Sequence, residues 1–273
     1  MDSTTRIQLL SDLHLESPAA YDIFDVATKA PFLALLGDIG YVKDDGFFHF
    51  LQRQLAAFKV VFLVFGNHEP YHSTWDEVKA KVKRFQDEIA KSARGGKAVG
   101  ELVLLDQTRY DISPNLTILG CTLFSEVAKE QFDYVSFGLN DFYHIRGWSV
   151  EGHNEAHSAD VAWLNQQVES ISSLEPNRRI IIFTHYSPST HENAVDPKHM
   201  NSNISSGFTT DLSDQQCWKS DSVALWAFGH THYNCNYRDS SSEKRVMTNQ
   251  RGYYFAQSAG FDEKMVIEVE DTQ

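Results

Sequence analysis

Five short apolar segments of this chain each run directly into polar side chains that are able to bind metal ions. The segments are residues 7–10, 32–36, 60–65, 180–184 and 223–228. The polar residues that follow them, in the same order, are Asp12 and His14, then Asp38, then Asn67 and His68, then His185, and finally His230 and His232. In α/β sheets, ligands bind in the crevice beyond the carboxyl ends of the strands. If the five segments are strands of one domain, these side chains therefore converge on one site.

The apolar segments and the stretches between them predict an α/β fold. Three further segments of the same kind are residues 102–105, 116–119 and 265–269. Most are continuously apolar, as expected of strands that are covered on both faces. Between the segments, residues 47–58 and 161–171 show the three-to-four spacing of helices, and Thr74 with Glu77 forms a capping box that opens another. Alternation of strands and helices favours an α/β domain with layered sheets.

The chain of 273 residues is long enough for one large domain or two small ones. It contains neither an interdomain linker nor an internal repeat, so we expect a single domain over residues 1–273. The one long irregular stretch is residues 186–222, which is rich in serine, threonine, asparagine and aspartate. Because loops of this length inside a compact domain are usually functional, we predict that it is a lid or substrate loop.

The formal net charge of −13 disfavours general binding to nucleic-acid backbones or to anionic membranes. An anionic substrate would need local positive charge, which metal ions can supply. The first residues do not resemble a secretory signal, and the apolar runs are too short to span a bilayer. The three cysteines are most simply free thiols in a reducing compartment; the alternative is one disulfide plus one free thiol. We therefore expect a cytoplasmic protein, and the sequence leaves its oligomeric state open.

The donor groups at the segment ends form a chemically coherent set. Imidazole, carboxylate and amide oxygen are ligands for Mn, Fe or Zn, and the absence of cysteine ligands argues against a structural zinc site. In the pairs Asp12/His14 and His230/His232, alternate residues of an extended backbone point to the same side and can reach one metal. The alternative is capping or turn chemistry at strand ends, which explains aspartate and asparagine but not the histidines.

These motifs, taken together and in order, resemble those of the calcineurin-like metallophosphoesterase superfamily. The motifs are Asp12-Leu13-His14, Gly37-Asp38, Gly66-Asn67-His68-Glu69, His185 and Gly229-His230-Thr231-His232. The resemblance implies a layered α/β/β/α sandwich with a site for two divalent metal ions at the carboxyl ends of the strands. It implies that Asp12, His14 and His232 hold the first metal, that Asn67, His185 and His230 hold the second, and that Asp38 bridges the two.

The same resemblance implies hydrolysis of a phosphate ester by a hydroxide that the two metals share. His68 would lie beside the metals, where it could stabilise charge or protonate the leaving oxygen, or it could have only a structural role. Serine/threonine phosphatases of this superfamily carry Gly-Asp-x-x-Asp-Arg-Gly after the second strand. Here the second aspartate and the arginine are missing after Asp38. The protein phosphatase branch is therefore disfavoured, and His68 lacks the aspartate that would support it.

A phosphodiesterase acting on small organic phosphates or nucleotides is the function that we predict. A diester carries one negative charge and needs fewer arginine clamps than a monoester dianion, and few arginines lie near the motifs. The alternatives are a phosphomonoesterase with the same fold and a non-catalytic scaffold that keeps the fold as an interaction surface. Tyr186 and His191 on the long loop, and Asn140 in a turn-like stretch, are candidate substrate contacts or ordinary solvated loop side chains.

Overall fold

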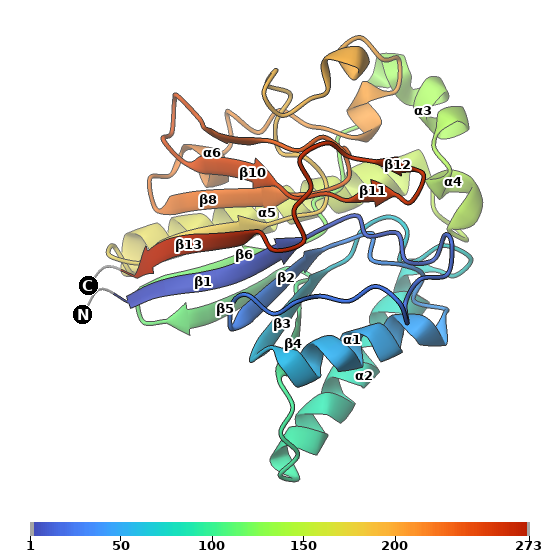
Figure 1. The fold of residues 1–273 in the computed structure, drawn as a ribbon. Coiled ribbons are helices and arrows are strands. Elements are labelled where there is room, and N and C mark those ends of the chain that lie inside the picture. Colours follow the sequence, from blue (N-terminus) through green and yellow to red (C-terminus); the bar gives the residue numbers. More distant parts are fainter. Residues whose placement is uncertain (1–2, 272–273) are drawn as a thin grey trace.

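Two large β-sheets packed face to face form the centre of the protein (Figure 1). The computed structural model describes residues 3–271. The first sheet has the order β13-β1-β2-β3-β4, with β1 Ser3–Leu10, β2 Phe32–Leu36, β3 Val60–Val64, β4 Glu101–Leu104 and β13 Val266–Asp271. The second has the order β5-β6-β7-β8-β10-β9, with β5 Thr108–Ser113, β6 Leu116–Gly120, β7 Arg179–Phe183, β8 Val223–Phe228, β9 Asn236–Arg238 and β10 Arg245–Thr248.

The inner strands of both sheets are parallel, and only the outer strands β13, β5 and β9 pair in the antiparallel sense. All eight apolar segments that the sequence predicts as strands are strands in the structure. In these two sheets β5, β9 and β10 were not predicted, because the sequence of β5 is less apolar and β9 and β10 have only three and four residues. A parallel arrangement brings the carboxyl ends of β1, β2 and β3, and those of β7 and β8, to the same end of the molecule.

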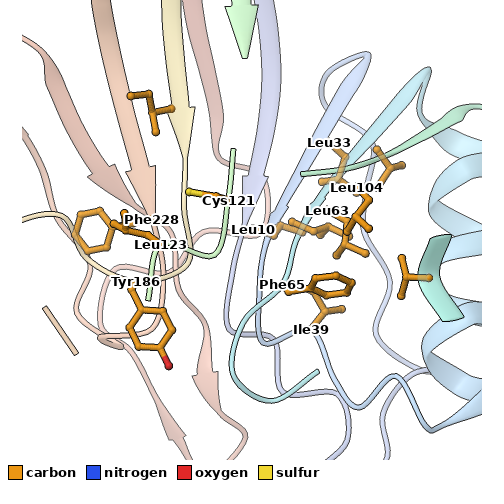
Figure 2. Packing of buried hydrophobic residues seen from close by; sticks show 14 of the residues in the cluster. Leu10, Leu33, Ile39, Leu63, Phe65, Leu104, Cys121, Leu123, Tyr186 and Phe228 are labelled. Atoms are coloured by element: carbon orange, nitrogen blue, oxygen red, sulfur yellow. The ribbon is translucent and has the colours of Figure 1, made fainter. Parts of the chain in front are cut away.

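Residues of one strand contribute to two separate layers of the core. In β2, Ala34 and Leu36 face the second sheet, whereas Leu33 and Leu35 belong to the layer under the helices. Figure 2 shows Leu33 and Leu63 on the helix side of the first sheet. Because both faces of the sheet are buried, the positions on both faces are apolar, which explains the continuous apolar runs in the sequence.

Helices cover the outer face of each sheet. On the first sheet lie α1 Asp45–Ala57 and α2 Trp75–Arg94, and on the second lie α5 Val150–Leu174 and α6 Gln216–Lys219 (Figure 1). The predicted capping box of α2 is present, with Glu77 N donating to Thr74 Oγ1 and Thr74 N donating to Glu77 Oε2. The predicted α/β/β/α sandwich is thus confirmed. Within residues 3–271, no helix has the length and apolarity that a bilayer crossing requires.

Short elements surround the end of the sandwich at which the parallel strands finish. They are η1 Lys129–Gln131, α3 Phe132–Gly138, α4 Asp141–His144, η2 Pro197–His199, η3 Ser205–Gly207, and the hairpin of β11 Gly252–Tyr253 and β12 Ala256–Gln257 (Figure 1). The segment 186–222, predicted as a lid or substrate loop, contains η2, η3 and α6. Cys121, Cys217 and Cys235 are free thiols, as the simplest interpretation of the sequence proposed.

Candidate metal centre

The carboxyl ends of five strands bring the predicted metal ligands together. Asp12, His14 and His232 form one group in which ligand atoms from all three residues lie within 4.8 Å of one another. The Nε2 atoms of His14 and His232 are 3.0 Å apart, and His232 Nε2 is 3.4 Å from Asp12 Oδ1. Imidazole nitrogens and a carboxylate at this spacing are able to share one cation.

Asp38, His185 and His230 form a second group with the same limit of 4.8 Å. His185 Nε2 lies 3.5 Å from Asp38 Oδ1 and 3.1 Å from Asn67 Oδ1, so the asparagine joins this group. Asp38 Oδ2 is in turn 3.8 Å from His14 Nε2. The two oxygens of Asp38 therefore face the two groups, which is the position that a bridging carboxylate requires.

The backbone at these residues is held in an uncommon conformation. Asp12, His14, Asp38, His230 and His232 have φ values of 53°, 46°, 53°, 69° and 51°. Non-glycine residues in this left-handed region cost about 1–3 kcal/mol each, and such residues cluster at functional sites. Five of the seven predicted ligands share this feature, so the pairs Asp12/His14 and His230/His232 do not have the extended backbone that the sequence led us to expect.

Hydrogen bonds outside the groups fix the orientation of the imidazoles. His185 Nδ1 donates to the carbonyl oxygen of Leu36 at 2.8 Å, and His14 Nδ1 lies 3.2 Å from Glu16 Oε1. Each bond leaves Nε2 free to face the centre, as is usual for histidines that bind metals. His230 Nε2 is buried and has no hydrogen-bond partner in the described part of the chain. A buried, unpaired nitrogen beside carboxylates fits a cation in the centre of the site.

The charges in the site also fit cation binding. Burial lowers the pKa of His14 and of His185 to about 4, so both imidazoles are neutral near pH 7 and able to act as ligands. Burial, together with the nearby carboxylates of Glu69 and Asp12, raises the pKa of Asp38 well above its usual range. Bound cations would remove this penalty by neutralising the carboxylates. The residues present are therefore suited to divalent metal ions.

His68 has a supporting carboxylate that sequence reasoning missed. Glu16 Oε1 lies 2.9 Å from His68 Nδ1, and the Glu16 side chain is 1% exposed. Burial lowers the pKa of His68, but the charges of Asp38 and Glu16 more than offset this effect and raise it to about 9. The sequence led us to expect no such partner, because the aspartate after the second strand is missing. The structure corrects that expectation: a glutamate from the loop after β1 takes the role.

Asp141, at the start of α4, orients the amide of Asn67. Asp141 Oδ1 accepts hydrogen bonds from Asn67 Nδ2 at 2.8 Å and from the Tyr71 hydroxyl at 2.6 Å. Its Oδ2 accepts from the Tyr186 hydroxyl at 3.3 Å. Because the amide nitrogen is held by Asp141, Asn67 Oδ1 faces His185. Sequence patterns do not indicate this contact, since Asp141 is 74 residues away from Asn67.

We expect Asp141→Ala to weaken metal binding at the group that contains Asn67. The released amide could rotate, and partners that orient a ligand typically contribute 10- to 100-fold to metal affinity, an order-of-magnitude range. Titration calorimetry with Mn²⁺ would measure the loss, and Asp141→Asn, which keeps an oxygen at this position, should lose less. Asp133→Ala is a matched control, because Asp133 is an exposed aspartate of the neighbouring helix α3. An Asp141→Ala protein that binds Mn²⁺ as the wild type does would contradict the assignment.

A cavity of about 260 Å³ opens over the two groups. Its floor is formed by Asp38, Asn67, His68, His230 and His232, and its walls include Tyr71, Leu139, Asn140, Phe208 and Tyr253. The predicted substrate contact Asn140 therefore does line the cavity. Tyr253, on the hairpin β11–β12, was not predicted, and its hydroxyl lies 3.3 Å from His68 Nε2. A two-residue strand gives no periodic signal in the sequence, so this contact could not be found from it.

Two predicted substrate contacts lie away from the cavity. Tyr186 is 1% exposed and belongs to the buried core (Figure 2), where its ring lies 4.0 Å from the ring of His230. It packs behind the site because the chain turns inward directly after His185. His191 is exposed and stacks on Tyr237 at 5.6 Å between ring centroids. In this structure, therefore, neither side chain has the predicted position.

Comparisons with known proteins agree with this geometry. The profile of the calcineurin-like phosphoesterase family matches residues 5–234. A protein of Acanthamoeba polyphaga mimivirus, described as uncharacterized, is 26% identical over 277 residues, which cover 90% of this chain and 91% of that protein. The crystal structure of phosphopantetheinyl hydrolase from Mycobacterium tuberculosis is similar with a TM-score of 0.67 and 14% identity, over 98% of this chain and 97% of that one. A dimetal phosphatase from Danio rerio gives a TM-score of 0.53 and 16% identity, over 89% and 86% of the two chains. On the extent of the family match and the arrangement of the site, the chain belongs to the calcineurin-like phosphoesterase family.

Proposed function

We propose that this phosphoesterase is a phosphodiesterase that acts on small organic phosphates or nucleotides with two divalent cations, Mn, Fe or Zn. The first cation would be held by Asp12, His14 and His232, the second by Asn67, His185 and His230, and Asp38 would bridge them. The position of Asp38 supports this division, since Oδ2 lies 3.8 Å from His14 Nε2 and Oδ1 lies 3.5 Å from His185 Nε2. When bound, the cations would supply an activated water as nucleophile and would neutralise charge on the phosphoryl oxygens.

The residues that line the cavity support a phosphodiester as substrate. Among the described residues that line it there is neither a lysine nor an arginine. A monoester dianion is usually bound by such cationic side chains, whereas a diester has a single negative charge. With the overall net charge of −13, additional anionic charge on the substrate would be unfavourable. A monoanionic ester therefore suits this cavity better than a dianion.

His68 and its neighbours are placed to help the leaving group depart. His68 Nδ1 is held by Glu16, and Nε2 lies within 3.9 Å of Asp38 Oδ2 and 3.3 Å of the Tyr253 hydroxyl, on the floor of the cavity. The Glu16 carboxylate, 2.9 Å from Nδ1, favours the protonated form of the imidazole. The protonated imidazole can donate a proton to the departing oxygen, while Glu16 stabilises the charged ring and fixes its orientation.

The decisive experiment compares bis(p-nitrophenyl) phosphate with p-nitrophenyl phosphate on protein reconstituted separately with Mn²⁺, Fe²⁺ and Zn²⁺. We expect kcat/KM for the diester to exceed that for the monoester by about ten-fold or more with the preferred metal, a modest discrimination for an active site. A strong preference for the monoester would instead identify a phosphomonoesterase. If two metals per chain are bound and neither ester is hydrolysed, the non-catalytic alternative is supported.

A further inference from the structure

A second cavity, of about 130 Å³, lies beside the cavity over the metal ligands. Residues of the segment 186–222 make most of its wall, and it is lined mainly by Val195, His199, Ser202, Ile204, Phe208 and Thr231. Apolar side chains and the carbon atoms of short hydroxyl residues form most of this surface, and no carboxylate, lysine or arginine contributes to it. The second cavity is therefore mainly apolar, whereas the cavity over the metal ligands is lined by many polar and charged side chains.

One aromatic residue lines both cavities. Phe208 lines both of them, and its half-buried ring stacks on the ring of His230 with 4.9 Å between centroids. Thr231, which lines the second cavity, stands between His230 and His232 in the sequence. A group attached to a phosphorus atom over the metal ligands would thus have the second cavity as its immediate neighbour.

The wall of the second cavity is fixed to the body of the protein. Ile204 and Phe208 pack against the buried cluster that contains Val135 and Leu139. Gln131 Oε1 accepts hydrogen bonds from the backbone nitrogen and the hydroxyl of Ser206, at 2.9 and 2.8 Å. This part of the loop is therefore anchored by α3 and η1. A cavity that is formed before binding loses little affinity to ordering of its walls.

We propose that this apolar pocket binds a compact apolar group on the organic part of the ester, such as an aromatic ring or a branched alkyl chain. The inference rests on the proposed function, because it takes the phosphorus to lie over the metal ligands. The size of the pocket fits a compact apolar group: an apolar cavity of about 150 Å³ binds benzene, and this pocket is only slightly smaller. Phosphate recognition by the metals and recognition of the organic group would then occur on opposite sides of Phe208.

The test is a binding measurement that does not depend on turnover. Methylphosphonate is compared by titration calorimetry with phenylalkylphosphonates that have one to three methylene groups, using the full chain loaded with Mn²⁺. We expect the best phenylalkyl compound to bind about ten-fold or more tightly than methylphosphonate, as for apolar groups that enter a fitted pocket. Val195→Trp would fill the pocket and should remove this difference. Its affinity for methylphosphonate, which has no group to place there, should be maintained.

Asn203→Trp is the matched control, because Asn203 is exposed on the same segment and does not line the pocket. Ile204→Ala, which removes apolar wall, should also reduce the difference and serves if the tryptophan variant does not fold. Equal affinities for methyl- and phenylalkylphosphonates in the wild type, or a difference that survives Val195→Trp, overturn the proposal. Phosphonate selectivity in a protein that hydrolyses no phosphate ester would instead refute the proposed function and leave the pocket assignment standing.

Discussion

Replacing Asp38 by asparagine should lower kcat for phosphodiester hydrolysis by about 1000-fold and reduce the metal content from two ions per chain. The expected loss corresponds to several kcal/mol of transition-state stabilisation, as is typical of the contribution of metal ions to catalysis. Asparagine keeps the shape of the side chain and an oxygen that can accept the hydrogen bond that Asp38 Oδ1 receives from His68 N at 2.9 Å. It loses the negative charge between the two groups, so cations there would no longer be held by a common carboxylate.

Metal content by atomic emission spectroscopy and kcat on bis(p-nitrophenyl) phosphate would measure the two effects together. Asp22→Asn is the control, because the Asp22 side chain is 85% exposed and is not one of the predicted metal ligands. Thermal unfolding should show that Asp38→Asn is folded. Burial raises the pKa of the Asp38 carboxylate, so its negative charge is unfavourable in the metal-free protein, and a neutral amide avoids that cost. An Asp38→Asn protein with two metals and unchanged kcat would show that the bridging assignment is incorrect.

The strands, the helices and the gathering of the ligands were predictable because each depends on a local pattern, whereas the four-layered sandwich was implied by the family resemblance. Continuous apolar runs predicted the strands, and the capping box at Thr74 and Glu77 predicted the start of α2. Parallel strands finish at one end of a sheet, so the residues after β1, β2 and β3 lie together, as do those after β7 and β8. The packing of the two sheets brings these two sets of residues to one site. This reasoning needs no knowledge of side-chain contacts.

Contacts that orient the ligands could not be predicted in the same way. Glu16 is only two residues beyond His14, yet its contact with His68 crosses 52 residues of sequence and depends on the path of the loop after β1. Asp141 likewise reaches Asn67 only because α4 packs beside the site. Tyr186 was predicted as a substrate contact because it lies on the long loop after the His185 strand, but the chain bends at these residues and the tyrosine ring enters the core.

The second large loss of kcat is expected from substitutions of His68 and of Glu16. His68→Ala should lower kcat by about 100- to 10,000-fold, the usual contribution of a general acid. Glu16→Gln should lower kcat by about 10- to 100-fold, because the imidazole loses the charge that stabilises its protonated form and fixes its orientation. Activity on bis(p-nitrophenyl) phosphate measures both, and Glu88→Gln, an exposed glutamate of α2, is the control.

The double variant shows through which histidine Glu16 acts, because Glu16 Oε1 contacts both His68 and His14. If Glu16 acts through His68, the double variant Glu16→Gln/His68→Ala should lose no more activity than His68→Ala alone, since effects of residues that act as a unit are not additive. Metal content should then stay at the wild-type value in Glu16→Gln. If the effects instead multiply and metal is lost, the glutamate serves mainly to orient His14. Glu16 would then support the metal centre, and His68 would be oriented only by its contacts with Asp38 and Tyr253.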